Sequence, residues 1–176
     1  IYATLAAYRI VKNDLLARDP DDPNITLQIG QQSAKGVEAA VGFDITPTLR
    51  IDVNGALISP RYDDYLQSAG DYSGNRPPNT PRRVANIWGS WAFAEGWVAR
   101  AGAHYVGEVF TNDANTTTRP SYTVVNAGLQ WKPRENMSLD LNIHNLTDRL
   151  YATSGGSTQW LLAPPRSASL DFHVTF

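Results

Sequence analysis

The protein has 176 residues, of which 42% are hydrophobic and 18% charged, and its formal net charge is -2. A chain without a surplus of basic residues cannot neutralise many phosphates, which argues against a nucleic-acid partner. The absence of cysteine excludes disulfides, thiolate metal sites and cysteine nucleophiles. The length predicts one domain or part of a larger one.

No run of about 18 apolar residues occurs, so the sequence predicts no transmembrane helix. A membrane β-barrel remains open, because its signal is only a series of alternating segments of about ten residues. No signal peptide opens the chain, and Ile1 already stands in a segment with the composition of a strand. We therefore expect either that the start has been removed or that this sequence is one piece of a longer protein.

Taken in chain order, the hydrophobic residues alternate with period two, and no convincing helical period appears. This pattern predicts about eight strands. They cover residues 1–12, 36–45, 49–58, 83–93, 97–110, 122–131, 137–145 and 167–176. In the second, one face carries only apolar side chains, which are Val37, Ala39, Val41, Phe43 and Ile45.

The connections between the predicted strands alternate between short and long. The short turns are 46–48, 94–96 and 132–136, and each contains Pro or Gly. The long connections are 13–33, 60–82, 112–121 and 146–166. In an up-and-down sheet this places all short turns at one end and all long loops at the other. Such long connections are uncommon in soluble domains and typical of outer-membrane barrels.

The predicted strands are about ten residues long, which is longer than the usual five or six and is the length that a tilted strand needs to cross a bilayer. Aromatic residues also gather toward the short-turn ends of the strands, as in an aromatic girdle at a membrane interface. These residues are Trp91, Phe93, Trp97, Trp131, Phe172 and Phe176. A soluble sheet alternates in the same way, so a soluble β-sandwich that binds a ligand remains an alternative. A small outer-membrane barrel that transports nothing is another.

Several motifs resemble one family. The stretch Asn145-Leu146-Thr147-Asp148-Arg149-Leu150-Tyr151 resembles the closing signature of TonB-dependent outer-membrane receptors, and Ala163-Pro164-Pro165-Arg166 resembles the segment before the last strand of ferric-siderophore receptors. The final alternating strand, with Phe172 and Phe176, is similar to the signal that the barrel-assembly machinery recognises. Asn79-Thr80-Pro81-Arg82 and Lys35-Gly36-Val37-Glu38 are similar to starts of strands in the same family.

The resemblance implies an all-β fold, an antiparallel up-and-down transmembrane β-barrel of 22 strands plugged by a separate N-terminal domain. Residues 1–176 would then supply about the last eight strands, without the plug. It implies a receptor in the bacterial outer membrane that binds and imports a ferric siderophore, with energy from the TonB complex passed through the absent plug. The other implied partners are the barrel-assembly machinery and outer-membrane lipid, and iron enters only as part of the transported siderophore.

No catalytic fingerprint occurs in the sequence, so we expect no enzyme and no catalytic residue. His104, His144 and His173 lie on separate predicted strands without metal-ligand spacing, so we expect no metal site and no cofactor.

Binding of a ligand is better supported by the composition of two long connections. Aromatic faces combined with arginine donors suit bulky, anionic, partly aromatic ferric siderophores. The candidate ligand-binding residues are Arg61, Tyr62, Tyr65, Tyr72, Arg76, Arg149, Tyr151 and Trp160. The competing interpretation is that Tyr62 and Tyr151 belong to the outer aromatic girdle.

Overall fold

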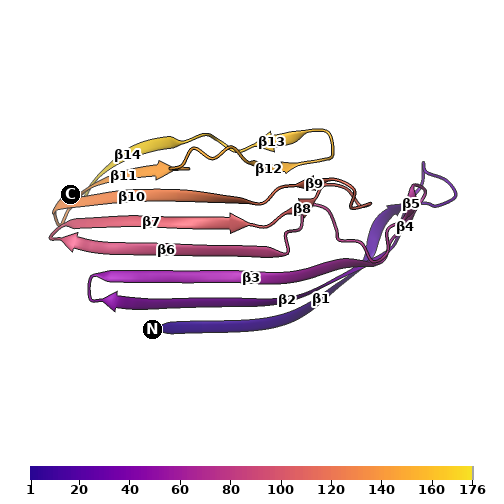
Figure 1. The fold of residues 1–176 in the computed structure, drawn as a ribbon, viewed down its shortest axis with the longest axis horizontal. Coiled ribbons are helices and arrows are strands. Elements are labelled where there is room, and N and C mark those ends of the chain that lie inside the picture. Colours follow the sequence, from indigo (N-terminus) through magenta and orange to yellow (C-terminus); the bar gives the residue numbers. More distant parts are fainter. Residues whose placement is uncertain (176) are drawn as a thin grey trace.

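The computed structural model describes residues 1–175, and its main feature is one antiparallel sheet of eight strands in the order β1-β2-β3-β6-β7-β10-β11-β14 (Figure 1). Consecutive large strands lie side by side, which is an up-and-down meander. The strands are β1 (Tyr2–Arg18), β2 (Thr26–Thr46), β3 (Leu49–Asp64), β6 (Arg83–Ala94), β7 (Trp97–Val106), β10 (Tyr122–Arg134), β11 (Met137–His144) and β14 (Ser167–Val174).

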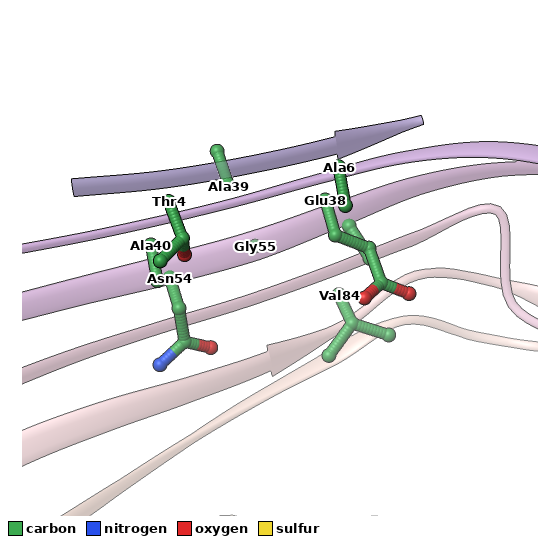
Figure 2. A pocket seen from close by; sticks show the side chains of 9 residues that line it. Thr4, Ala6, Glu38, Ala39, Ala40, Asn54, Gly55 and Val84 are labelled. Carbon is green, nitrogen blue, oxygen red and sulfur yellow. The ribbon is translucent and has the colours of Figure 1, made fainter. Parts of the chain in front are cut away.

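The strand registers confirm that the sheet has one polar and one apolar face. Val41 lies opposite Val53, and Val53 lies opposite Ile87, so these three share the apolar face. On the other face Asn86 Nδ2 donates to Asn54 Oδ1 at 2.7 Å. Figure 2 shows the alternation directly: Glu38 and its neighbour Ala39 project to opposite sides of β2.

The described residues form this one large sheet and three two-stranded ribbons, and no second large sheet packs against it. The apolar face is therefore left open, with Val41 38%, Val53 40% and Ile87 49% exposed to solvent in the chain alone. A β-sandwich would bury that face. The sandwich alternative is excluded, and the transmembrane barrel wall is the fold that agrees with the open apolar face. The described chain also holds no helix long and apolar enough to span a membrane.

Three short turns join the strands at the end where the two chain termini also lie (Figure 1). In the β2–β3 turn, Thr46 Oγ1 accepts the backbone N–H groups of Thr48 at 3.3 Å and Leu49 at 3.0 Å, as a Thr side chain does at a tight turn. In the β6–β7 turn, Gly96 has φ +73°. Its carbonyl accepts the N–H of Lys132 at 2.7 Å, which fastens this turn to β10.

The prediction of a long connection over 13–33 is wrong. β1 continues to Arg18 and β2 begins at Thr26, so the connection is only 19–25. Asp14, at φ 56°, occupies a bulge that shifts the register of β1 without ending the strand. The apolar residues Ile25, Leu27 and Ile29 do alternate, but this stretch is short, follows the Asp- and Pro-rich segment 19–23 and is interrupted by the consecutive polar residues Gln31, Gln32 and Ser33. It was therefore not recognisable as part of a long strand.

The other three long connections fold into small ribbons of their own. β4 (Leu66–Gln67) pairs with β5 (Gly70–Asp71), β8 (Val109–Phe110) with β9 (Thr118–Arg119), and β12 (Ala152–Gly155) with β13 (Trp160–Leu162). β3 runs on to Asp64, so the connection predicted from residue 60 starts later than expected. The predicted strand 97–110 is interrupted, because β7 ends at Val106 and β8 is separate.

Four aromatic side chains near the short-turn end form a continuous row across β6, β7 and β10. Trp91 contacts Phe93 with ring centroids 5.6 Å apart, Phe93 contacts Trp97 at 6.2 Å, and Trp97 stacks on Trp131 at 5.5 Å. Phe172 stands opposite Leu139 on β11 and is 61% exposed. Phe176 lies outside the described residues.

Replacement of Gly96 by alanine should lower the free energy of unfolding by about 1–2 kcal/mol, because a side chain in the left-handed region is strained. The added Cβ would also stand 2.5 Å from the carbonyl oxygen of Lys132. Thermal unfolding of the detergent-solubilised full-length protein measures the change. Gly156→Ala is the matched control, since a Cβ there meets nothing within 4 Å. Equal losses in the two variants would contradict the role of Gly96.

Candidate functional site

Two long connections at the outer end of the sheet, 65–82 and 107–121, are locked together. Tyr62 Oη, at the base of the first, donates to Asp113 Oδ1 in the second at 2.7 Å. Asn75 Nδ2 donates to the carbonyl oxygen of the same Asp113 at 2.8 Å. Both contacts converge on one residue, so the first connection is fixed to the tip of the second.

Asn115 makes the second set of contacts between these connections. Its Oδ1 accepts the backbone N–H of Arg76 at 2.9 Å, and its Nδ2 donates to the carbonyl of Arg76 at 2.8 Å. The side chain of Asn115 thereby makes the pair of hydrogen bonds that the backbone of a neighbouring β-strand would make. Its own backbone has φ 55°, a left-handed conformation that Asn tolerates. The Arg76 guanidinium lies over the ring of Phe110 at 4.3 Å, which is cation–π distance.

Two candidates of the first connection are used in this packing. Tyr62 is 6% exposed and Arg76 is 7% exposed. Burial, and secondly the charge of Arg82, lower the pKa of Arg76. Tyr65 stacks on Tyr62 with ring centroids 4.1 Å apart, and burial raises the pKa values of both phenols above their usual range. Within the described chain Tyr62 bonds to the second connection, whereas Tyr65 Oη donates to the carbonyl of Leu16 on β1 at 3.4 Å.

The remaining candidates of this connection are separate from one another. Arg61 Nε forms an ion pair with Asp63 Oδ1 at 2.8 Å on the outer part of β3. Tyr72 is half-buried, and its backbone N–H is bonded to the carbonyl of Tyr65. The structure does not bring Arg61 or Tyr72 to the candidates of the last connection, 145–166.

Three candidates from that last connection do come together. Arg149, Tyr151 and Trp160 line one hollow of about 180 Å³ with Arg119 and Tyr122, which the sequence analysis missed. Tyr151 and Tyr122 lie in ring contact, with centroids 4.4 Å apart. We call this the arginine hollow. It combines two guanidinium groups with three aromatic rings, although Arg119 already donates to Asn79 Oδ1 at 2.9 Å.

A second hollow, of about 510 Å³, lies on the polar face of the sheet and has Tyr122 and Tyr151 as a wall in common with the first. His104 and His144 line it, so we call it the histidine hollow. His104 Nδ1 is 2.5 Å from Asn86 Oδ1. Asn86 Nδ2 donates to Asn54 Oδ1, so Asn86 presents its oxygen to His104 and can accept a hydrogen bond from Nδ1. None of the residues that line this hollow is Asp, Glu, Lys or Arg.

The signature that begins at Asn145 is a structural joint next to these hollows. Asn145 is 3% exposed and has φ 52°. Its Oδ1 accepts the N–H of Arg149 at 2.8 Å, and its Nδ2 donates to the carbonyl oxygen of Arg149 at 3.0 Å. Asp148 Oδ1 accepts the N–H of Arg166 at 2.9 Å, just before β14. The joint therefore fixes both ends of the last connection and holds Arg149 and Tyr151 in place.

A third hollow, of about 240 Å³, lies on the polar face of β1–β3 (Figure 2). Small side chains form it, and Glu38 and Asn54 project on the same side. A single carboxylate without a partner base gives no acid–base pair. Within residues 1–175, no three His, Asp or Glu side chains gather as metal ligands.

Comparison with known proteins identifies a common architecture. Residues 1–146 match the family model described as TonB dependent receptor-like, beta-barrel. The metal-pseudopaline receptor CntO of Pseudomonas aeruginosa is 27% identical over 177 residues, covering 98% of this chain and 24% of that receptor. The ferrioxamine B receptor of Salmonella typhimurium is 30% identical over 164 residues, covering 88% of this chain and 23% of that receptor.

Among solved structures, the siderophore receptor PiuA from Acinetobacter baumannii superposes with a TM-score of 0.84 at 26% identity. The match covers 98% of this chain and 26% of that one. The chain thus spans about a quarter of the length of the relatives that it matches.

Tyr62→Phe should loosen the two locked connections, because it removes the hydrogen bond to Asp113 and leaves that carboxylate without this partner. We expect hydrogen exchange in 65–82 and 107–121 to become about 5- to 10-fold faster, which corresponds to the ~1 kcal/mol of a typical hydrogen bond. Tyr72→Phe, in the same connection, serves as control. Faster exchange in both variants, or in neither, would contradict the lock.

Asn145→Ala should free the last connection, because it removes the side-chain bonds to Arg149 and puts alanine at a positive φ. We expect a loss of about 2 kcal/mol or more in local stability over 145–166. Hydrogen exchange measures it, with Asn142→Ala on β11 as control because its amide makes only a 3.4 Å contact to Asp171. Unchanged exchange in the Asn145 variant would refute the joint.

Proposed function

Because the chain belongs to the TonB dependent receptor-like β-barrel family, we propose that it forms the C-terminal part of the barrel of a receptor that imports a ferric siderophore. The members of this family are outer-membrane receptors that transport ligands and are not enzymes, and the chain belongs to this family. Ferrioxamine B and metal–pseudopaline receptors among the relatives support a metal chelate as cargo. The energy would reach the receptor from TonB through the plug domain.

The observation that carries the proposal is the arginine hollow. Arg149 is exposed at the outer end of the sheet, and Trp160 beside it is 46% exposed. A guanidinium can donate to the oxygens of an anionic chelate, and an aromatic ring packs against its organic backbone. We assign Arg149, Tyr151 and Trp160, with the additional residue Tyr122, to the first contact with the ligand. Arg119 is only 6% exposed and donates to Asn79 Oδ1, so it would support the hollow from behind.

The histidine hollow would then receive an uncharged part of the same ligand. It lies on the polar face, which faces the lumen in a transmembrane barrel. The Tyr122–Tyr151 pair forms a wall of both hollows. A ligand that leaves the arginine hollow toward the lumen would therefore pass this pair first.

Tyr62 and Arg76 would support the ligand site from behind rather than contact the ligand, because their side chains contact the neighbouring connection. Tyr65 would support it indirectly, through its stacking on Tyr62. Arg61 and Tyr72 would reach a ligand only if it extended beyond the arginine hollow. The row of Trp91, Phe93, Trp97 and Trp131 would anchor the periplasmic interface of the membrane. Phe172 and Phe176 would form the signal for the barrel-assembly machinery.

The direct experiment is to delete the gene of the parent receptor and to supply single ferric siderophores, measuring uptake of radiolabelled iron for each. The panel should contain hydroxamate, catecholate and carboxylate chelates, and uptake of at least one should depend on the receptor and on TonB. If no chelate in the panel needs the receptor, the proposal of siderophore import is refuted.

Arg149→Gln in the full-length receptor should weaken binding of an anionic ferric siderophore that the panel identifies by about 10-fold, which is the loss of about 1.4 kcal/mol. The reason is the loss of one charge-assisted hydrogen bond. Equilibrium binding to the purified receptor measures this. Arg134→Gln, at the short-turn end of β10, changes net charge equally and should leave binding unchanged.

A further inference from the structure

A row of polar side chains crosses β3, β6 and β7 and ends at an imidazole ring in the histidine hollow. Asn54 stands opposite Asn86, and Asn86 stands opposite His104. Asn86 Nδ2 donates to Asn54 Oδ1 at 2.7 Å, and Asn86 Oδ1 lies 2.5 Å from His104 Nδ1. The amide of Asn86 is thus oriented by one neighbour and presents its oxygen to the other.

The ring of His104 is also held by the next strand. Tyr122 on β10 contacts it edge-on, with ring centroids 6.4 Å apart and an angle of 61° between the planes. His104 is half-buried and lines the histidine hollow. A neutral imidazole that donates a hydrogen bond from Nδ1 carries its lone pair on Nε2. The row therefore fixes the ring and favours the form that has Nε2 as a free electron-pair donor.

This arrangement is the one that orients a histidine for a metal ion. A ligating histidine almost always donates its second ring N–H to an oxygen that holds the ring and sets its tautomer. Asn86 Oδ1 occupies that place for His104, and Asn54 in turn holds Asn86. His144 lines the same hollow and is exposed. We select His104 as the metal-binding candidate because its ring has this support.

The hollow is unsuited to a free metal ion. Protein sites for a bare transition metal supply three or four ligands, whereas no group of three His, Asp or Glu side chains exists within residues 1–175. The lining of the hollow also contains no carboxylate to balance a cation. A metal that reaches His104 must therefore arrive with most of its ligands already bound. Anionic chelating groups cancel the charge of the metal, so a neutral centre can enter a hollow that has no counter-charge.

We propose that His104 Nε2 coordinates the metal of an incoming chelate that leaves one coordination position open. A water molecule leaves the metal and the lone pair of Nε2 takes its place, without transfer of an electron or a proton. Imidazole suits iron, copper, nickel and zinc centres. Asn86 is then a positioning residue, which acts through His104.

This inference rests on the proposed function, since the chelate is the cargo, and it names the class of cargo. The neutral metal centre is the uncharged part of the ligand that the histidine hollow receives. Tyr122 and Tyr151 form a wall of both hollows, so an anionic arm of the same chelate can stay beside Arg149. A chelate that fills every position of its metal gains nothing from His104, which makes the site selective for incompletely coordinated metals.

The test uses the full-length receptor in detergent, without a histidine tag, and copper(II)–iminodiacetate as probe. This complex is neutral and leaves coordination positions open. Titration calorimetry measures its affinity, and pulsed electron paramagnetic resonance at half an equivalent of probe detects the remote nitrogen of a coordinated imidazole. His104→Gln should weaken binding by roughly 10-fold or more and should abolish the imidazole signal. Asn86→Ala should weaken binding by about 10-fold, and Asn86→Asp, which keeps an oxygen acceptor, should restore it.

The matched control is His173→Gln, which removes an exposed imidazole opposite Ser138 and outside the hollow. It should bind the probe like the unmodified receptor, and a heat-induced shift on gels verifies that every variant is folded. Tris(glycinato)cobalt(III), a neutral and inert complex without an open position, should bind weakly and equally to all variants.

Three results would each overturn the proposal. These are unchanged affinity and imidazole signal in the His104 variant, an equal loss in the His173 variant, and a dependence of the cobalt complex on His104. If Asn86→Asp fails to restore binding, the positioning role of Asn86 is refuted. None of these outcomes decides whether iron uptake depends on the receptor, which the chelate panel tests separately.

Discussion

Lipid offers no hydrogen-bond partner to a peptide group, so every backbone N–H and C=O that crosses the membrane must be bonded inside the protein. Eight strands in one unbroken antiparallel series meet this requirement between neighbours. Because each strand is then extended, its side chains alternate strictly between two environments. The open face with Val41, Val53 and Ile87 and the hydrogen-bonded face with Asn54 and Asn86 are both consequences of that one constraint.

Outside the membrane, water can bond to the backbone, so regular strand pairing is no longer required. There the chain uses Asn and Asp residues to form and fix its turns. The non-glycine residues with positive φ in the described chain are all Asn or Asp, namely Asp14, Asn79, Asn115, Asn145 and Asp148. Such side chains tolerate the left-handed region and can bond nearby backbone. Asn115 fixes one connection to another, and Asn145 together with Asp148 fixes both ends of a third. The connections at the outer end are thus held by hydrogen bonds from Asn and Asp side chains rather than by an apolar core.

This division explains what the sequence could predict. Inside the membrane, alternation alone identified the strands around Val37 to Ile45, because one face had to be apolar. It failed for residues 26–35, where the consecutive polar residues Gln31, Gln32 and Ser33 interrupt the short alternation of Leu27 and Ile29. Composition selected Arg149, Tyr151 and Trp160, which lie in one connection and line one hollow, and their role in ligand binding stays a prediction. It could not reveal that Tyr62 and Arg76 are buried, because their partners Asp113 and Asn115 come from a connection about 40 to 50 residues away. Tyr122 and His104 were missed for the same reason.

The Tyr122–Tyr151 pair is a wall of two compartments of different character, one with arginines and one with histidines. A change in either ring therefore alters both compartments together, whereas Trp160 lines only the arginine hollow. Under the proposed function, a variant that acquires a new ligand can change Trp160 with fewer side effects than either tyrosine. Sequence substitutions among descendants of this protein should accordingly accumulate at Trp160 and its exposed neighbours. Tyr122 and Tyr151 should be substituted less often, because each lines both hollows.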